Sequence, residues 1–445
     1  MAQRKTPLLA GLLTGVFLSV GGAQAQTLTV EAPIKTVEIV QTAPALDIEG
    51  MTEWRQDFHA HPETAYEETR TAAKIDELLT SWGIETHTNI GKTGVVGILK
   101  GKQTGENSPS ICLRADMDAL SMTEADTTLS YRSQTPGKMH ACGHDGHTAM
   151  LLGAAKYLSE SKNFTGTVYF VFQPAEEGGA GAKAMIDDGL FDIVDCDGMY
   201  GMHTWPSLPA GKIGIAEGNI TANSDRFTIK ITGKGGHAAY PANNIDVVAM
   251  ASELVTALHD YKGDNVPETE GAVLAVTNMH GGEALNAMPE ILELGGTVRT
   301  FTDDTQDKLE KAITDIAERL AKEYGATVDV EYKRGYPSVF NSAEQTQNAR
   351  EAAIEALGAD NIVEFKRTMA GEDFAYFNDH APGSYVALGQ GKTDGSKNTH
   401  LHSPTFNFND AVLKNGAQYW VNLVENELPV QSAKPAPVKP QSNTP

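Results

Sequence analysis

Cysteine and basic residues are both scarce in this sequence. Three cysteines in 445 residues exclude a scaffold held together by many disulfides and leave at least one thiol unpaired. Lys and Arg total 35 against 58 Asp and Glu, which gives a formal net charge of -23. A chain of that charge repels phosphate backbones and anionic lipid surfaces. Nucleic acids and membrane surfaces are therefore not expected as partners.

The sequence also lacks a long apolar run after its N-terminus. Two basic residues, Arg4 and Lys5, precede an uncharged run over residues 7–22 and a triplet of small residues at 23–25. This layout is typical of a secretory signal peptide, and the run is short for a membrane span. We expect export, most simply to the periplasm or to the medium, with no stable membrane insertion. An uncleaved N-terminal anchor is the alternative.

The length of 445 residues predicts more than one domain. We expect an inserted domain because the pattern of elements changes near residue 222 and changes back near 335. The C-terminal segment is rich in Pro, Ser, Gln and Lys, a composition typical of disorder. The predicted parts are a signal peptide at 1–25, a leader at 26–47, a main domain at 48–221 and 335–428, an inserted domain at 222–334, and a disordered tail at 429–445.

Strand-like and helical patterns alternate along the main domain. Alternation of this kind predicts an α/β fold, here a three-layer α/β sandwich. The expected strands are residues 110–114, 168–172 and 198–202, and the expected helices are residues 69–82, 148–158 and 411–424. Within the first strand, Cys112 lies among apolar residues and is expected to be an inert core thiol.

The inserted segment shows the order β-α-β-β-α-β of a ferredoxin-like α+β unit. Its second predicted helix has an apolar stripe of Leu309, Ile313, Ile316 and Leu320, with charged residues on the other face. The expected elements are residues 227–231, 247–258, 272–279, 291–300, 304–324 and 327–332.

The densest chemical signal is the stretch from Met139 to His147, which holds three His, one Cys and one Asp. Imidazole and thiolate groups are favoured metal ligands, and a loop containing Gly143 can bend them toward one point. The alternative is a polar loop that opens a helix near Thr148. Cys142 and His144 are the leading candidates for ligands.

Two adjacent acids, Glu176 and Glu177, follow a predicted buried strand. One can bind a metal while its neighbour takes the proton of an attacking water. A solvated loop ahead of a helix is the alternative reading. His203 and His402 are weak signals by themselves, but together they supply the number of ligands that a two-metal site requires.

Asp116 and Asp118 stand two residues apart at a predicted strand end, which would place both carboxylates on the same side. From there one of them could orient a metal-binding histidine.

The sequence resembles the aminoacylase and carboxypeptidase-like metallohydrolases, in the branch that holds hippurate hydrolase and the plant auxin-conjugate hydrolases. The likeness runs from about Met51 to Val424. It is carried by motifs in the family's order and spacing, which are Cys-Gly-His-Asp, Gln-Pro-Ala-Glu-Glu, Gly-Met-His, Gly-Gly-His-Ala-Ala, Gly-Thr-Val-Arg and Leu-His-Ser-Pro. The inserted segment then resembles the family's lid and dimerisation domain.

The resemblance implies a role for each motif residue. Glu176 is the implied general base, Asp118 the implied supporting acid beside the metals, and His237 the residue that stabilises the oxyanion, often across a dimer. Asn286 and Arg299 match positions near the substrate carboxylate, a role that suits the planar Arg side chain. The implied ligands of two divalent ions, Zn or Mn and possibly Ni or Co, are Cys142, His144, Glu177, His203 and His402, with Cys142 as the apparent bridge.

We therefore expect a metallo-amidohydrolase that cleaves the amide bond of an N-acyl amino acid or a related small conjugate, with a metal-activated water and Glu176 as general base. An exported dipeptidase or carboxypeptidase and a non-catalytic metal- or ligand-binding protein of the same fold are the alternatives. The resemblance also implies a homodimer or homotetramer through the lid. The motifs leave open which acyl group and which amino acid are preferred.

Overall fold

The computed structural model describes residues 44–430 except 106, 127 and 395–398. The predicted signal peptide, the leader up to residue 43 and the tail from residue 431 lie outside the described residues. Within the described part of the chain, no helix combines the length and the apolar character needed to cross a membrane.

An eight-stranded sheet in the order β1-β2-β4-β3-β5-β16-β6-β15 forms the centre of the main domain. Its central pairs β4-β3, β3-β5 and β5-β16 are parallel, and β3 is buried along its whole length. The strands are β1 (Glu85–Ile90), β2 (Gly94–Lys100), β3 (Ser110–Asp116), β4 (Thr167–Gln173), β5 (Gly198–Pro209), β6 (Ile213–Ile215), β15 (Ile362–Glu364) and β16 (Gly383–Gly391).

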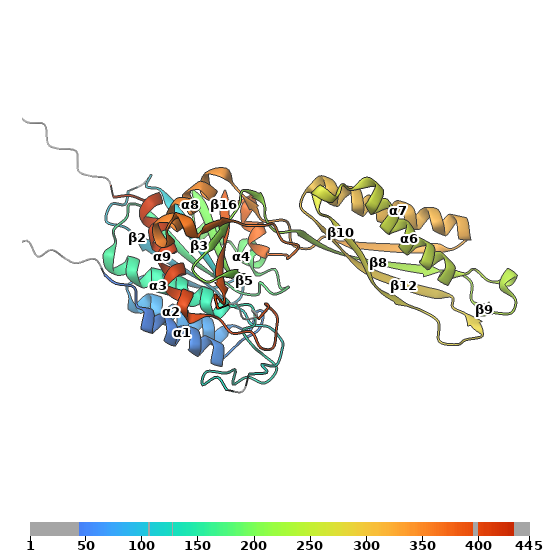
Figure 1. Ribbon diagram of the computed structural model, residues 1–445, viewed down its shortest axis with the longest axis horizontal. Helices are drawn as coiled ribbons and strands as arrows, with labels where there is room; N and C mark the ends of the chain where they lie inside the picture. The colour runs from blue at the N-terminus through green and yellow to red at the C-terminus, as the bar shows by residue number, and fades with distance from the viewer. Residues whose placement is uncertain (1–43, 106, 127, 395–398, 431–445) are drawn as a thin grey trace, which may run out of the picture. The chain divides into compact units, whose positions relative to one another are not determined.

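Helices cover both faces of this sheet (Figure 1). One face packs with α1 (Ile48–Ala60), α2 (Thr69–Ser81), α3 (His144–Ser161), α8 (Ala343–Leu357) and α9 (Leu413–Glu427). The other packs with α4 (Gly181–Asp187), α5 (Leu190–Ile193) and the 3-10 helix η4 (Asp373–Asp379). Alternate residues of β3 divide between these cores, with Leu113 in the first and Cys112 in the second. The expected three-layer α/β sandwich is confirmed.

The inserted segment, called the lid below, forms a four-stranded antiparallel sheet in the order β10-β12-β8-β13. Its elements follow the expected β-α-β-β-α-β order, and both helices join the sheet in one apolar core that includes Leu309 and Ile313. They are β8 (Asn223–Thr232), α6 (Val247–Asn265), β10 (Val273–His280), β12 (Ile291–Thr300), α7 (Asp303–Tyr324) and β13 (Thr327–Lys333). A separate two-stranded antiparallel sheet pairs β9 (Gly236–His237) with β11 (Ala287–Met288).

Helix α3 begins four residues earlier than expected, at His144 instead of Thr148. Gly143 allows this start because it adopts φ 95°, a left-handed conformation that favours glycine. His144 and His147 are therefore helical residues in the first turn of α3, and they do not belong to a loop.

The expectation of a free thiol at Cys112 is wrong. Cys112 forms a disulfide with Cys196, with a Cα–Cα distance of 5.7 Å. The side chain points to the face of β3 opposite to Leu113, and Cys196 belongs to the same packing layer just before β5. Cys142 is buried and is the free cysteine of the described residues.

Candidate active site

A pocket of about 710 Å³ lies beside the carboxyl ends of the central strands of the sandwich. Ligands in open α/β sheets bind at such strand ends. Glu176 and Glu177 follow β4, and His203 lies on β5 two residues beyond Gly201, where the pairing with β3 stops. Cys142 precedes α3. These four residues and His402 all line the pocket.

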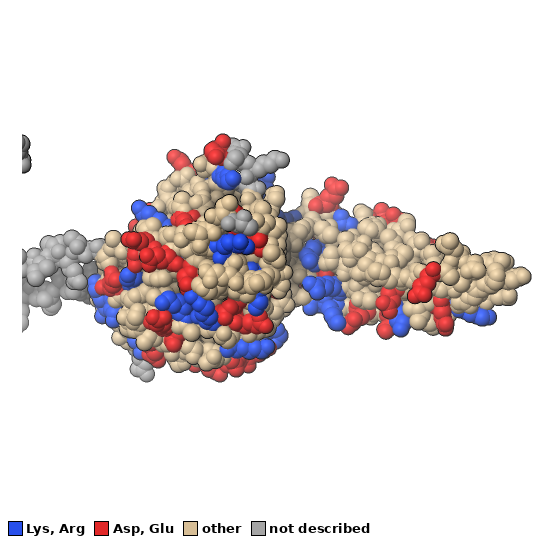
Figure 2. Space-filling model, turned by 90° about the horizontal axis from the view of Figure 1, so that it is seen from below, with Lys and Arg blue, Asp and Glu red and all other residues tan. Residues whose placement is uncertain are grey.

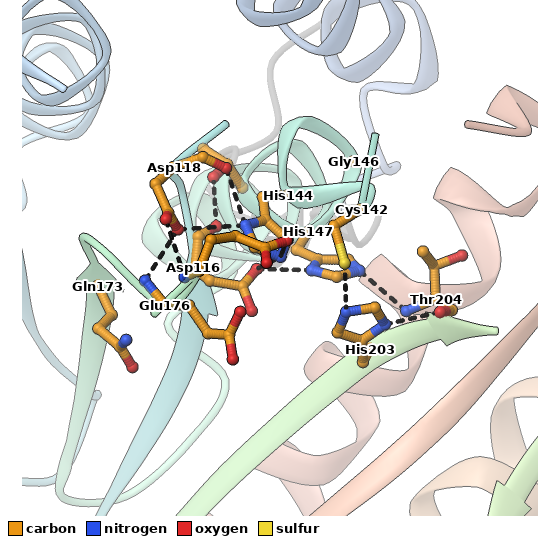
Figure 3. Close-up of polar contacts among 12 residues, drawn as sticks. Asp116, Asp118, Cys142, His144, Gly146, His147, Gln173, Glu176, His203 and Thr204 are labelled. Atoms are coloured by element: carbon orange, nitrogen blue, oxygen red, sulfur yellow. Dashed lines mark hydrogen bonds and ion pairs between the residues drawn. The ribbon is translucent and has the colours of Figure 1, made fainter. Parts of the chain in front are cut away.

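Cys142, His144 and His203 form the first group of possible metal ligands, with ligand atoms within 4.8 Å of one another. Cys142 Sγ lies 3.3 Å from His203 Nε2 (Figure 3). Each histidine uses Nδ1 to donate to a backbone carbonyl, His144 to Asp118 O at 2.8 Å and His203 to Thr204 O at 2.6 Å. These bonds fix the tautomer and leave both Nε2 atoms facing the site.

Cys142, Glu177 and His402 form the second group. His402 Nε2 lies 3.1 Å from Glu177 Oε1. The backbone of His402 adopts φ 57° and its amide donates to Ala141 O at 2.8 Å, which ties this late segment to the loop before α3. The sulfur of Cys142 thus belongs to both groups, as expected for a ligand shared by two ions.

The residues present fit divalent cations. His144 Nε2 is buried, lies 4.0 Å from Glu177 Oε1 and has no hydrogen-bond partner among the described residues. Buried polar atoms are rarely left without a partner, and a bound ion would supply one. A thiol, three imidazoles and a carboxylate form a donor set suited to zinc and similar divalent ions.

Burial and neighbouring charges shift the pKa of two proposed ligands, Cys142 and His144. Burial raises the pKa of the Cys142 thiol, and Glu177 and Glu176 raise it further. Burial acts to lower the pKa of His144, but Asp116 and Asp118 outweigh it and raise this pKa to about 10. Both groups therefore hold protons that a metal ion must displace, so binding should release protons.

Asp118 holds the two catalytic candidates after β4 in place. Its Oδ1 accepts the Glu176 amide and its Oδ2 accepts the Glu177 amide, both at 3.0 Å (Figure 3). Its Oδ1 also lies 3.3 Å from His144 Nδ1. Glu68 Oε1 accepts the amide of Ala175, which adopts φ 53°. Asp118 thus contacts the backbone that carries the base and one ligand, which is the position of a supporting acid.

Glu176 is buried beside further acids. Burial raises its pKa well above the usual range, and Glu372 and Asp373 act in the same direction. Arg114, itself fully buried, donates to Glu372 at 3.0 Å and to Asp373 at 3.1 Å. A carboxyl with a raised pKa suits general acid and base chemistry near neutral pH.

Sequence reasoning missed this network around Glu176. The motif Met-Ala-Gly-Glu-Asp-Phe, which contains Glu372 and Asp373, also matches the family at the edge of the site, but the sequence predicts no role for either acid or for Arg114. The available signal was a charged residue inside an apolar strand, because a buried Arg requires carboxylate partners.

Asp116 and Asp118 have different partners, although the sequence predicted both carboxylates on the same side of one strand. Asp116 ends β3 and makes buried ion pairs with Arg114 at 2.7 Å and His147 at 2.6 Å. His147 Nε2 accepts the Thr204 amide at 2.9 Å. This chain of contacts joins β3, α3 and β5 behind the ligands.

The three lid candidates fall in two places. Arg299 lines the pocket and is half-buried. His237 lies in β9 and Asn286 directly precedes β11. Both are exposed, the Ala238 amide donates to Asn286 O at 3.0 Å, and neither residue lines the pocket. The described residues of one chain therefore bring Arg299 to the pocket but not His237 or Asn286.

Comparison with known proteins gives the same picture over most of the chain. The family model described as Peptidase family M20/M25/M40 matches residues 112–426. The chain is 38% identical over 371 residues to the N-acetylcysteine deacetylase of Bacillus subtilis, covering 83% of this chain and 94% of the relative. It is 38% identical over 381 residues to the hippurate hydrolase of Campylobacter jejuni, covering 85% and 97%.

A similar solved structure is the Bacillus subtilis YXEP protein, described as a dinuclear metal binding peptidase. It superposes with a TM-score of 0.74 at 35% sequence identity, covering 86% of this chain and 98% of that chain.

Proposed function

The chain belongs to the peptidase family M20/M25/M40, and on that premise we propose that its metal-dependent amide hydrolysis acts on N-acyl amino acids and related small conjugates. The observation that carries the proposal is the position of Cys142 in two ligand groups beside the buried Glu176. The names of the two relatives, a deacetylase of N-acetylcysteine and a hippurate hydrolase, support this class of substrate.

The residues divide the reaction among them. Two divalent ions on Cys142, His144, Glu177, His203 and His402 would supply Lewis acidity for the scissile carbonyl and for the attacking water. The carboxylate of Glu176 takes the proton of that water and gives it to the leaving nitrogen. Asp118 accepts the backbone amides of Glu176 and Glu177 and so fixes their positions. The Arg299 guanidinium binds the carboxylate of the substrate.

The test is hydrolysis of N-acetyl amino acids, N-benzoyl amino acids and dipeptides by protein reloaded with Zn²⁺, Mn²⁺, Ni²⁺ or Co²⁺. The matched control is Glu176→Gln, which keeps the size of the side chain and all five proposed ligands. We expect the metal-loaded wild type to release free amino acid, and the variant to retain metal with turnover lower by about 10²- to 10⁴-fold. Near-normal turnover of the variant would contradict the role of Glu176.

Two other outcomes favour the alternative functions. Faster cleavage of dipeptides than of N-acyl amino acids indicates a dipeptidase or carboxypeptidase. Metal binding without cleavage of any substrate in the panel indicates a binding protein.

We further propose that two subunits associate through their lids and that His237 completes the pocket of the partner. The lid exposes Tyr240, Met279, Leu285 and Ile291, with Leu285 fully accessible. On the face drawn in Figure 2, the tip of the lid shows mostly uncharged residues. A hydrophobic patch of this kind is typical of a protein interface.

Mixed oligomers test this arrangement. His237→Ala and Glu176→Ala should each be inactive alone, and subunit exchange should restore activity because one site of a mixed dimer holds both native residues. Absence of restored activity in mixtures shown to contain mixed dimers would place His237 in the site of its own chain or outside catalysis.

Export is a separate proposal. The disulfide between Cys112 and Cys196 supports it, because such bonds persist in oxidising compartments. Fractionation of the native host and sequencing of the mature N-terminus test it, with Gln26 expected as the first residue. A protein recovered in the cytosol with residues 1–25 intact would contradict it.

A further inference from the structure

The outer face of the lid sheet carries positive charge at the end that lines the pocket. In β8, Ser224 and Arg226 alternate with the buried Asp225 and Phe227, so they lie on the face opposite to the helices. Register places Lys333 directly opposite Arg226, and Arg299 opposite Ser224. Arg226, Arg299 and Lys333, called the cation row below, therefore share one face, and all three line the pocket.

The cation row is unusual in a chain of net charge -23. Like charges directly opposite each other on a sheet repel and destabilise it, which is the relation between Arg226 and Lys333. Among the described residues, neither Arg226 nor Arg299 makes an ion pair with a carboxylate. The Arg299 side chain donates instead to the backbone oxygens of Asp225 at 3.3 Å and Val298 at 3.0 Å.

Two other basic residues of the lid at the pocket do have carboxylate partners, unlike Arg226 and Arg299. Arg334, also at the pocket, forms ion pairs with Asp307 and with Glu310. Lys333 forms a 2.8 Å pair with Glu331 on its own strand, where both side chains are exposed and such a pair contributes little. The two arginines of the row are left with their charge uncompensated beside a substrate pocket.

The cation row continues into the catalytic side of the pocket. Ser224 lies against Gly371, so closely that a side chain at position 371 would meet Ser224 Cβ at 3.1 Å. Gly371 precedes Glu372, which also lines the pocket. One end of the pocket therefore presents cations and the other presents the proposed metal ligands and Glu176.

A substrate with one carboxylate occupies one guanidinium. The α-carboxylate of an N-acyl amino acid can be received by Arg299, which leaves Arg226 and Lys333 without a partner from the substrate. On the premise of the proposed function, we propose that the cation row selects N-acyl amino acids with a second carboxylate. That second carboxylate belongs either to the amino-acid side chain or to the far end of the acyl group.

Three substrates of similar size test the selection. N-acetyl-L-glutamate carries the second carboxylate on the amino acid, N-succinyl-L-alanine carries it on the acyl group, and N-acetyl-L-glutamine has none. We expect kcat/KM for one dicarboxylate to exceed that for the glutamine conjugate by about tenfold or more, because a charge-assisted hydrogen bond is stronger than a neutral one. The preferred dicarboxylate identifies the position of the second charge.

Variants test whether the cation row causes the preference. In Arg226→Gln and in Lys333→Gln the ratio of kcat/KM between the preferred dicarboxylate and the glutamine conjugate should fall, by about tenfold in the double variant. Lys230→Gln is the matched control, because Lys230 lies on the same strand and the same face but outside the pocket lining. An unchanged ratio in the double variant would overturn the proposal.

A binding measurement separates this proposal from the proposed function. Isothermal titration of the metal-free protein with glutarate, a dicarboxylate without a scissile bond, should show binding that weakens in the double variant and at high salt, but not in Lys230→Gln. If glutarate binds with that dependence but no substrate is hydrolysed, the cation row is a dicarboxylate-binding site and the proposed amide hydrolysis is wrong. Hydrolysis of all three substrates at equal rates would retain the amidohydrolase and reject selection by the row.

Discussion

The sandwich buries several charged side chains, whereas the described part of the lid keeps nearly all of its charged side chains at the surface. In the sandwich, Arg114, Asp116, Asp118 and His144 are buried and satisfy one another around the pocket. In the described part of the lid, Asp225 is the one buried ionisable group, and the core is apolar. Buried charges hold one another in fixed positions, as catalysis requires, while exposed charges can be exchanged at small cost in stability. The contrast agrees with the two proposals, in which the metal ligands and the general base lie in the sandwich and the cation row of the lid selects the substrate.

Apart from Glu176 itself, the largest loss of activity is expected where a buried charge of the sandwich holds the turn that carries Glu176 and Glu177. Asp118→Asn replaces one acceptor by an NH₂ group that faces a backbone N–H, so the amides of Glu176 and Glu177 cannot both be accepted. We expect kcat/KM to fall by about 100-fold and metal affinity by about 10- to 100-fold. Steady-state kinetics and metal titration measure the two quantities. Glu318→Gln, at an exposed lid carboxylate outside the pocket lining, is the control, and equal losses in both variants would contradict the contrast.

Removal of the disulfide should destabilise the sandwich alone. Cys112 and Cys196 are 84 residues apart, and closing a loop of that length is worth roughly 4.5 kcal/mol in the chain-entropy description. Urea unfolding of the Cys112→Ala/Cys196→Ala double variant, followed by the fluorescence of the sandwich tryptophans, measures the change. The lid contains no cysteine and serves as the internal reference through its hydrogen exchange. Loss of protection in both regions to the same extent would show that they unfold as one unit.

His59 should make the stability of the sandwich depend on pH. Burial acts to lower its pKa, but hydrogen bonds to Asp145 at 2.8 Å and Glu124 at 3.3 Å outweigh burial and raise the pKa from 6.5 to about 9. A pKa raised in the folded state gives stability that is complete below pH 6.5 and is lost as the pH rises through about 9. The full contribution is about 3 kcal/mol.

The measurement is the difference in free energy of unfolding between wild type and His59→Asn. This difference should shrink as the pH increases from about 6.5 to 9. A difference that stays constant over this range would show that His59 is neutral in the folded protein.

The smallest effect is expected at the buried carboxylate of the lid. Asp225 accepts Gln306 and Tyr332, each at 2.7 Å, and the Gly335 amide at 3.0 Å where the chain returns to the sandwich. Asp225→Ala leaves these donors without their acceptor and should cost about 2 kcal/mol of lid stability. Hydrogen exchange of β8 and β13 measures this loss. Reduced metal content in the variant would show that the lid and the metal site are coupled.

Local patterns predicted most of the fold. The expected strand at residues 291–300 coincides with β12, and the apolar stripe of Leu309, Ile313 and Leu320 packs into the lid core as expected. Periodicity works here because each element buries one face against a single partner layer. The candidate ligands were found from local motifs because thiol, imidazole and carboxylate groups cluster along the chain. Four of the five line the pocket, and the ligand atom of His144 lies within 4.8 Å of those of Cys142 and His203.

Contacts between distant segments could not be predicted in this way. Glu176 and Glu372 are 196 positions apart in the sequence. They lie side by side because the helix η4, which begins after Glu372, packs against β5. The partner of Cys112 depends on which face of β3 its side chain takes. The sequence predicted the start of α3 four residues too late. Glycine is typical of loops, but the left-handed backbone of Gly143 lets the helix begin at His144.

The grip of Asp118 on two successive amides has a consequence for how such an enzyme can diversify. Glu176 and Glu177 are neighbours in the chain, so their Cα atoms stay 3.8 Å apart whatever surrounds them. A backbone shift at either residue disturbs a contact that the other shares, and an inserted residue would separate amides that one carboxylate now accepts. The positions of Glu176 and Glu177 are therefore constrained together. New substrate preferences must arise elsewhere, in residues such as Arg226 that can change one at a time.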